Sequence, residues 1–127
     1  MLLWGRALEP LARLVNERRV QLAFSPTTID ELLRVIRYPK IRKVAEKLAV
    51  PIESLADKLI AASVVVHPSQ RVAVVRGDSA DNRILEAALE SGAMCIISGD
   101  KHLLKLKRFQ GILIVPPRVF LRRFANF

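Results

Sequence analysis

Short runs of β-prone residues alternate with segments whose apolar residues recur at the helical period, and this alternation constrains the fold more than any other feature of the sequence. The first helical segment, Arg6–Arg18, carries one apolar stripe, and the β-prone run Val20–Phe24 follows it. Strands that alternate with helices predict a mainly parallel sheet with helices on both faces. We therefore expect a three-layer α/β/α fold built from a single domain over residues 1–127.

Caps and prolines set the boundaries of the expected elements. Ser25 can cap a helix, and Pro26 suits the first helical position. The uninterrupted apolar run Met94–Ser98 is typical of a strand buried on both faces. The other expected strands are Ser63–His67 and Ile112–Val115, with Arg71–Val75 also β-prone. The remaining expected helices are 26–37, Lys40–Ala49, Ile52–Ala62, the segment from Gly77-Asp78-Ser79 to Ser91, Lys101–Leu106 and Pro117–Phe124.

The composition narrows the class of protein. Apolar residues make up 51% of the chain and charged residues 26%, which favours a packed core over disorder. No apolar run is long enough for a transmembrane helix, and there is no signal-peptide pattern. The lone Cys95 excludes a disulfide framework and a cysteine-based zinc site, so we expect a cytoplasmic protein. The 21 Lys and Arg residues against 12 Asp and Glu give a net charge of +9, which favours nucleic acid as a partner over a membrane surface.

Three acidic residues lie where a parallel sheet would gather them. Glu31 follows the Val20–Phe24 strand, Asp81 opens the helix before Met94–Ser98, and Asp100 comes directly after that strand. Clustered carboxylates repel one another unless a divalent cation neutralises them. Each acid also has a structural interpretation. Glu31 can be solvated, Asp81 can stabilise a helix dipole and Asp100 can cap a helix.

Other reactive residues form no recognisable site. His67 and His102 make no zinc-type cluster, so we interpret both as structural or surface residues, although His102 lies near enough to Asp100 to touch a substrate. Cys95 lies in a buried strand and acts as a small hydrophobic residue. The chain has no glycine-rich phosphate loop, which excludes nucleotide hydrolysis of the P-loop type.

Four segments together resemble PIN-domain proteins, and within them the VapC-like toxin components of bacterial and archaeal toxin–antitoxin pairs. The most specific segment is Ser91-Gly92-Ala93 followed by Ile96-Ile97-Ser98-Gly99-Asp100-Lys101-His102-Leu103-Leu104. The likeness runs in register from residue 6 to residue 124. The other three segments are 25–35 with Pro39-Lys40, 78–88, and 111–121.

The resemblance implies a set of site residues. In that family a quartet of acids holds Mg²⁺ or Mn²⁺ and cuts RNA. By matching position, Glu31 is the second acid, Asp81 the third and Asp100 the fourth, while Asn82 and Ser98 orient the carboxylates. The resemblance also implies an antitoxin protein whose tail covers the acidic cleft.

Basic residues surround these positions in the sequence. Arg34, Lys40, Lys101 and Lys105 belong to clusters that either hold RNA phosphates around the acids or form solvated faces. The chain has one Trp and one Tyr, so its capacity to stack on bases is small and no sequence preference follows.

One departure from the family pattern concerns the beginning of the fold. The family opens with a central strand that ends in an aspartate, whereas here no aspartate precedes Asp30. Without that strand, its two neighbours would present unpaired backbone edges in the core. Three explanations stay open: a start codon placed too late, replacement by Arg71–Val75, or a second chain that completes the sheet in a homo-oligomer such as a dimer.

The leading hypothesis from the sequence is a divalent-metal-dependent ribonuclease of toxin type. The missing aspartate favours an alternative, a catalytically degenerate PIN-like module that binds RNA or protein. A third interpretation is a structural homo-oligomer whose basic charge serves solubility only.

Overall fold

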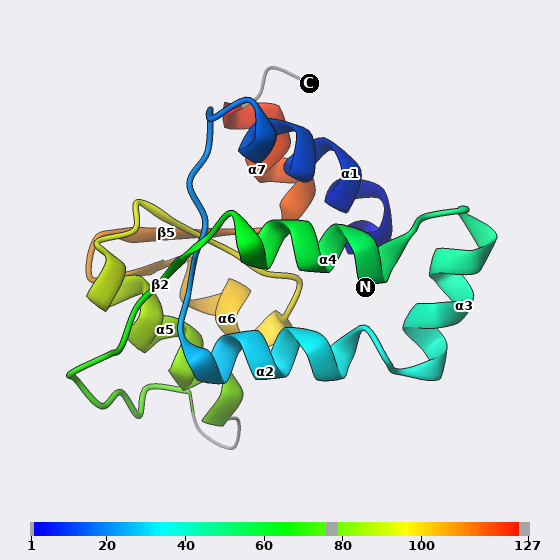
Figure 1. Ribbon diagram of the computed structural model, residues 1–127. Coiled ribbons are helices and arrows are strands. Elements are labelled where there is room, and N and C mark those ends of the chain that lie inside the picture. Colours follow the sequence, from blue (N-terminus) through cyan, green and yellow to red (C-terminus); the bar gives the residue numbers. More distant parts are fainter. Residues whose placement is uncertain (1, 76–78, 125–127) are drawn as a thin grey trace.

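The computed structural model describes residues 2–75 and 79–124 of the chain, and the backbone alone over residues 2–8 (Figure 1). Helices and strands alternate as the sequence predicts, and the Gly77-Asp78 part of one expected helix start lies outside the described residues. The helices are α1 (Leu2–Asn16), α2 (Pro26–Val35), α3 (Pro39–Lys47), α4 (Ile52–Ala61), α5 (Ser79–Ser91), α6 (Lys101–Leu106) and α7 (Pro117–Phe124). The strands are β1 (Ala23–Phe24), β2 (Val64–Val65), β3 (Cys95–Ile97), β4 (Arg108–Phe109) and β5 (Ile112–Val115).

The fold is α/β, as expected, and its strands form two sheets among the described residues. In the first sheet β1 pairs with β2 in parallel. In the second, β3 pairs with β5 in parallel, and the short β4 is added antiparallel to β5. The strands that define the α/β pattern are therefore all parallel to their partners, as the sequence predicts.

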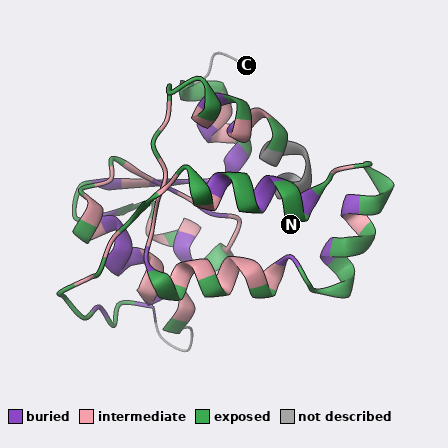
Figure 2. Cartoon of the chain, in the orientation of Figure 1, coloured by how far each residue is buried: buried purple, intermediate pink, exposed green. Residues whose placement is uncertain are grey.

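Two apolar clusters cover the two faces of the second sheet. Ile96 packs in one cluster with residues of α5 and α6, among them Leu85 and Leu103. Its neighbours Cys95 and Ile97 pack in the other cluster, to which α1, α3, α4 and α7 contribute. This alternation is what a strand buried on both faces requires, and Figure 2 shows the buried residues concentrated on the inner sides of the helices.

No helix of the described chain is both long enough and apolar enough to cross a membrane.

Each sheet has an open edge. Successive residues of a strand direct their backbone polar groups to opposite sides. In β3, Met94 and Ser98 bond to β5 through their backbone, so the backbone groups of Cys95 and Ile97 point to the other side. In β1, Leu22 and Phe24 accept bonds from the β2 segment, so the groups of Ala23 point away from β2. Within residues 2–75 and 79–124, no strand pairs with these edges.

The β-prone segment Arg71–Val75 is not a strand and does not fill the space between the two sheets. Val72 and Val75 pack instead against α5 and α6, in the cluster that contains Leu85. One of the three explanations for the missing strand, replacement by this segment, is therefore wrong. The physical reason is that side chains of α5 bond to the backbone of the segment and hold it on the helix.

Helix α2 starts where the Ser-Pro pair predicts. The Ser25 hydroxyl accepts a hydrogen bond from the Thr28 N–H, and the Ser25 N–H donates to the Thr28 hydroxyl at 2.8 Å, with Pro26 in the first turn. This reciprocal cap satisfies backbone donors that the helix itself leaves unpaired. It fixes the direction in which the chain leaves β1 and enters the helix that carries Glu31.

Candidate metal centre

Asp81 lies in the first turn of α5 and is almost fully buried, with 4% of its surface exposed. A carboxylate at this position is stabilised by the dipole of the helix. Apolar neighbours in α5, Leu85 and Ala88, anchor the helix in the core and so fix the place of its first turn. The helix therefore holds a buried carboxyl group at a defined point of the fold.

Asp100 is the N-cap of α6, at the end of the connection that follows β3. Its Oδ1 accepts hydrogen bonds from the N–H of His102 at 2.8 Å and of Leu103 at 3.4 Å. The N–H of Asp100 donates to the hydroxyl of the buried Ser98 at 3.0 Å. The structural interpretation of Asp100 as a cap is thus correct, and the same contacts fix the orientation of its carboxylate.

The fold brings Asp81 and Asp100 together from opposite ends of the α5–β3 unit. Together with His102, each residue offers one ligand atom, and these three atoms all lie within 4.8 Å of one another. Asp81 is buried, Asp100 half-buried and His102 exposed, so the cluster extends from the core to solvent. Two of the three acids that the sequence singled out therefore meet at one point.

The donor set fits a divalent cation. Hard oxygen ligands suit Mg²⁺ and Mn²⁺, and an imidazole nitrogen binds transition metals. Ligand atoms about 2.1 Å from Mg²⁺ lie at most about 4.2 Å apart, so a small side-chain adjustment would let all three contact one ion. The pair of carboxylates would be repulsive without such an ion.

Glu31 does not join this cluster in the side-chain arrangement of the structure. It lies on α2, forms an ion pair with Arg34 one turn further on, and its side chain is 28% exposed. Helix α2 contacts α5, so Glu31 belongs to an element adjacent to Asp81. The structure therefore places the third acid on a neighbouring helix.

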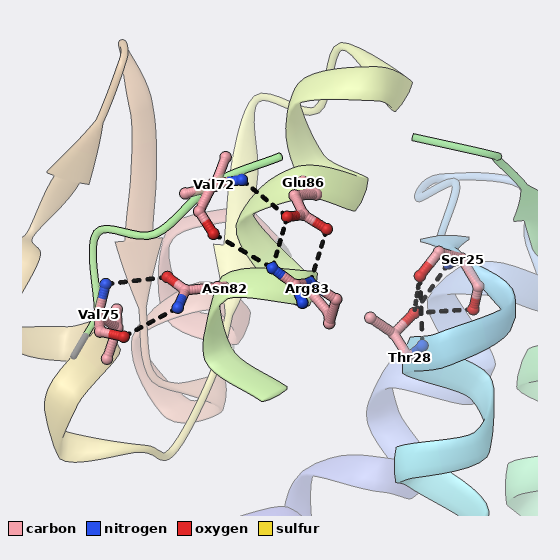
Figure 3. Close-up of polar contacts among 7 residues, drawn as sticks. All are labelled: Ser25, Thr28, Val72, Val75, Asn82, Arg83 and Glu86. Carbon is pink, nitrogen blue, oxygen red and sulfur yellow. Dashed lines mark hydrogen bonds and ion pairs between the residues drawn. The ribbon is translucent and has the colours of Figure 1, made fainter. Parts of the chain in front are cut away.

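Side chains of α5 also hold the segment that precedes it (Figure 3). The Asn82 amide accepts from the Val75 N–H at 2.9 Å and donates to the Val75 carbonyl at 2.8 Å. These bonds direct the Asn82 amide to the backbone of Val75, whereas Ser98, the other residue expected to orient a carboxylate, contacts Asp100 directly. Asn82 thereby fixes the loop next to Asp81 rather than contacting Asp100 through these bonds.

One turn further along α5, the buried Glu86 accepts from the Val72 N–H at 2.7 Å and pairs with Arg83. Burial alone would raise the pKa of Glu86, but the Val72 N–H and the Arg83 guanidinium outweigh it and hold that pKa below 4.5. Glu86 is therefore a structural anion that helps to fasten residues 72–75 onto α5.

The basic residues expected to contact RNA are all exposed. Arg34 lies on α2 and Lys40 opens α3, while Lys101 and Lys105 lie on α6. Lys101 directly follows Asp100, so positive charge adjoins the acidic cluster.

Two surface hollows lie elsewhere, between α3 and α4 and beside the end of α1, and neither is lined by Asp81 or Asp100.

Cys95 is the first residue of β3 and is half-buried. Its burial raises the pKa of the thiol to about 11, although Arg123 opposes the shift. The thiol is therefore protonated at neutral pH, in keeping with the expected role of a small hydrophobic residue.

His102 lies near Asp100, as its spacing predicts, but the sequence does not identify it as a possible metal ligand. It is exposed, as expected for a surface residue, but its ligand atom belongs to the cluster of Asp81 and Asp100. The spacing of His102 from Asp100 is the sequence signal that could have indicated its place in the cluster. A residue two positions after an N-cap aspartate donates its N–H to that carboxylate, and the two side chains therefore lie at the same end of the helix.

Comparison with known protein families gives one match. A family model described as a PIN domain matches residues 3–102, which is more than half of the chain and includes Asp81, Asp100 and His102. Neither a curated protein nor a solved structure matches the chain.

Proposed function

Because the chain belongs to the PIN-domain family, whose members are typically nucleases, we propose that it is a divalent-metal-dependent endoribonuclease that hydrolyses RNA phosphodiester bonds. The meeting of Asp81 and Asp100 within 4.8 Å carries the proposal. These residues are 19 positions apart in the sequence; Asp81 lies in the first turn of α5 and Asp100 caps α6. Each carboxylate also has a local role, Asp100 as the cap of α6 and Asp81 in the first turn of α5, but neither role requires the two to meet.

We assign roles to the residues of the site on this basis. Asp81 and Asp100 would hold Mg²⁺ or Mn²⁺, and Glu31 would act through a water molecule. When bound, such an ion polarises a phosphoryl oxygen and lowers the pKa of an attacking water. Ser98 holds Asp100 in place through its hydroxyl, and Asn82 keeps the loop beside Asp81 fixed.

Substrate binding would use the exposed cations near the acids. Arg34, Lys40, Lys101 and Lys105 would contact RNA phosphates, and each such contact adds to the dependence of affinity on salt. With few aromatic residues in the chain, phosphate contacts rather than base stacking would dominate the affinity.

An RNA-cleavage assay with Mg²⁺ or Mn²⁺ tests the proposal. Removal of a metal ligand costs several kcal/mol of transition-state stabilisation, so Asp81→Asn and Asp100→Asn should each lower the rate by about a hundredfold or more. Asn is as good an N-cap as Asp, so Asp100→Asn keeps α6 intact. Asp57→Asn, on the exposed side of α4, is the matched control and should keep full activity. Cleavage that survives both site substitutions would refute the assignment.

A second candidate function is a degenerate PIN module that binds RNA without cutting it. The position of Glu31 outside the cluster favours this candidate, because two acids and a histidine hold a cation less strongly than a set completed by further acids. Salt-dependent RNA binding with no cleavage at saturating Mn²⁺ would select this function.

We also propose that the enzyme is the toxin of a toxin–antitoxin pair, a role that the resemblance of residues 91–104 to VapC-like proteins supports. Expression of the chain in a bacterial host should then arrest growth, and expression of Asp100→Asn at the same level should not. Equal growth of the two strains would contradict the toxin role while leaving the cleavage assay unaffected.

A further inference from the structure

We propose that His102 is the third protein ligand of the metal centre, and that its imidazole makes the site select a transition-metal ion such as Mn²⁺ over Mg²⁺. The inference rests on the proposed function, since it concerns the same ion. It adds a ligand that the sequence analysis had interpreted as a surface residue.

The first observation that supports His102 as a ligand is its position relative to Asp100. The N–H of His102 donates to Asp100 Oδ1 at 2.8 Å, so the backbone of one ligand is fixed to the carboxylate of the other. The Nδ1 atom of His102 lies 3.6 Å from the same oxygen, which is an ion-pair distance for a protonated ring but beyond hydrogen-bond distance, so the neutral imidazole makes no hydrogen bond to Asp100.

The second observation is the exposure of the His102 side chain. The His102 side chain is 62% exposed, so its imidazole is open to an ion that arrives from solvent. Glu31, the other residue considered for this place, is already paired with Arg34 and lies outside the cluster. Of the described residues with His, Cys, Asp or Glu side chains, His102 is thus the one that the geometry adds to the two aspartates.

The chemistry of the donors gives the selectivity. Mg²⁺ binds oxygen and keeps most of its waters, so it gains little from an imidazole. First-row transition ions accept an imidazole nitrogen more readily than Mg²⁺ does, and Mn²⁺ gains least among them, so a site with two carboxylates and one nitrogen favours these ions over Mg²⁺. The preference of the site for transition ions over Mg²⁺ thus depends on one side chain, that of His102.

Metal binding to the whole chain, without RNA, tests the inference. Electron paramagnetic resonance would measure the concentration of free Mn²⁺ during a titration and so give its affinity. Competition by added Mg²⁺ would then give the affinity for Mg²⁺. We expect His102→Ala to weaken Mn²⁺ binding by about tenfold or more while Mg²⁺ affinity stays within about twofold, so that the preference of the parent chain for Mn²⁺ falls by the same factor. His67→Ala, in an exposed histidine outside the cluster, is the matched control and should behave as the parent chain.

A spectroscopic measurement makes the ligand itself visible. Pulsed electron paramagnetic resonance of the Mn²⁺-loaded chain should show coupling to an imidazole nitrogen that disappears in His102→Ala and persists in His67→Ala. Mn²⁺ binding that is lost in Asp100→Asn but unchanged in His102→Ala, with no nitrogen coupling in the parent chain, would overturn the role of His102 alone. Absence of Mn²⁺ binding in the parent chain would overturn the metal centre and the proposed function with it.

Discussion

The two sheets of the molecule differ in how well they are covered, and the difference separates the acids of the site. In the β3–β5–β4 sheet, Ile96 and Ile114 are buried, and the adjoining α5 and α6 contribute the fully buried Leu85 and Leu103. In the β1–β2 sheet, both residues of β2 are exposed, and α2 has no fully buried residue. Asp100 follows β3 of the better covered sheet, whereas β1 of the other sheet leads into the helix of Glu31, and α5, which carries Asp81, contacts both β3 and β1.

The comparison indicates why two acids meet and the third does not. A packed helix or strand holds its side chains within a narrow range, which the convergence of two carboxylates requires. A helix without a buried residue leaves its charged side chains free to pair locally, as Glu31 does with Arg34. The quality of packing beneath each element therefore decides the geometry of the site.

The largest effect should come from the buried ion pair that fastens residues 72–75 to the well-packed half. Glu86→Ala leaves the Val72 N–H and the Arg83 guanidinium without their partner, and we expect a loss of about 3 kcal/mol in the free energy of unfolding. Urea denaturation measures it. Glu53→Ala removes the exposed pair with Arg42 and should cost less than about 1 kcal/mol. Equal effects of the two substitutions would break the comparison.

The same residue predicts a dependence on pH. The pKa of Glu86 is lower in the folded chain than its ordinary 4.5, so its stabilising contribution is complete above 4.5 and is lost as the pH falls through the folded-state pKa. Glu86→Gln should therefore flatten the acid side of the stability profile relative to the parent chain.

A smaller effect should come from the cap of α2, on the less covered half. Ser25→Ala removes the hydroxyl that accepts the Thr28 N–H, and we expect a loss of about 1 kcal/mol in the free energy of unfolding. Thr27→Ala, at an exposed position of the same first turn, should change stability little. A loss as large as that of Glu86→Ala would show that the β1–α2 region is as tightly packed as the other half.

The smallest effect should come from Glu31 itself. Its pair with Arg34 is exposed, so Glu31→Gln should change the free energy of unfolding by less than about 0.5 kcal/mol. The same substitution should weaken Mn²⁺ binding less than Asp100→Asn does, because Glu31 lies outside the cluster. A loss of affinity equal to that of Asp100→Asn would place Glu31 in direct contact with the ion and end the distinction between the two halves.

Most of the fold followed from local patterns in the sequence. The helices α6 and α7 and the strand β5 have the bounds that their apolar residues, caps and prolines predict. The short β4 was not predicted, since it depends on a tight turn in which Gln110 and Gly111 both adopt positive φ before β5 begins. Arg71–Val75 is β-prone but forms no strand, because side chains of a helix that comes later in the chain bond to its backbone.

The site was predictable in part for a related reason. The approach of Asp81 to Asp100 depends on where helices and strands begin and end, which periodicity and caps reveal. The ion pair of Glu31 and the membership of His102 depend on how individual side chains rotate, which neither pattern encodes. Sequence patterns thus locate the elements that carry the candidate site, and the packed structure shows which side chains meet there.

Crystals of the chain soaked in Mn²⁺ would test the central claim most directly, through the anomalous scattering of the ion. The account predicts one strong peak in contact with the carboxylates of both Asp81 and Asp100, and its loss in crystals of Asp100→Asn. A well-ordered map with no peak between these carboxylates, or with the ion bound elsewhere, would contradict it.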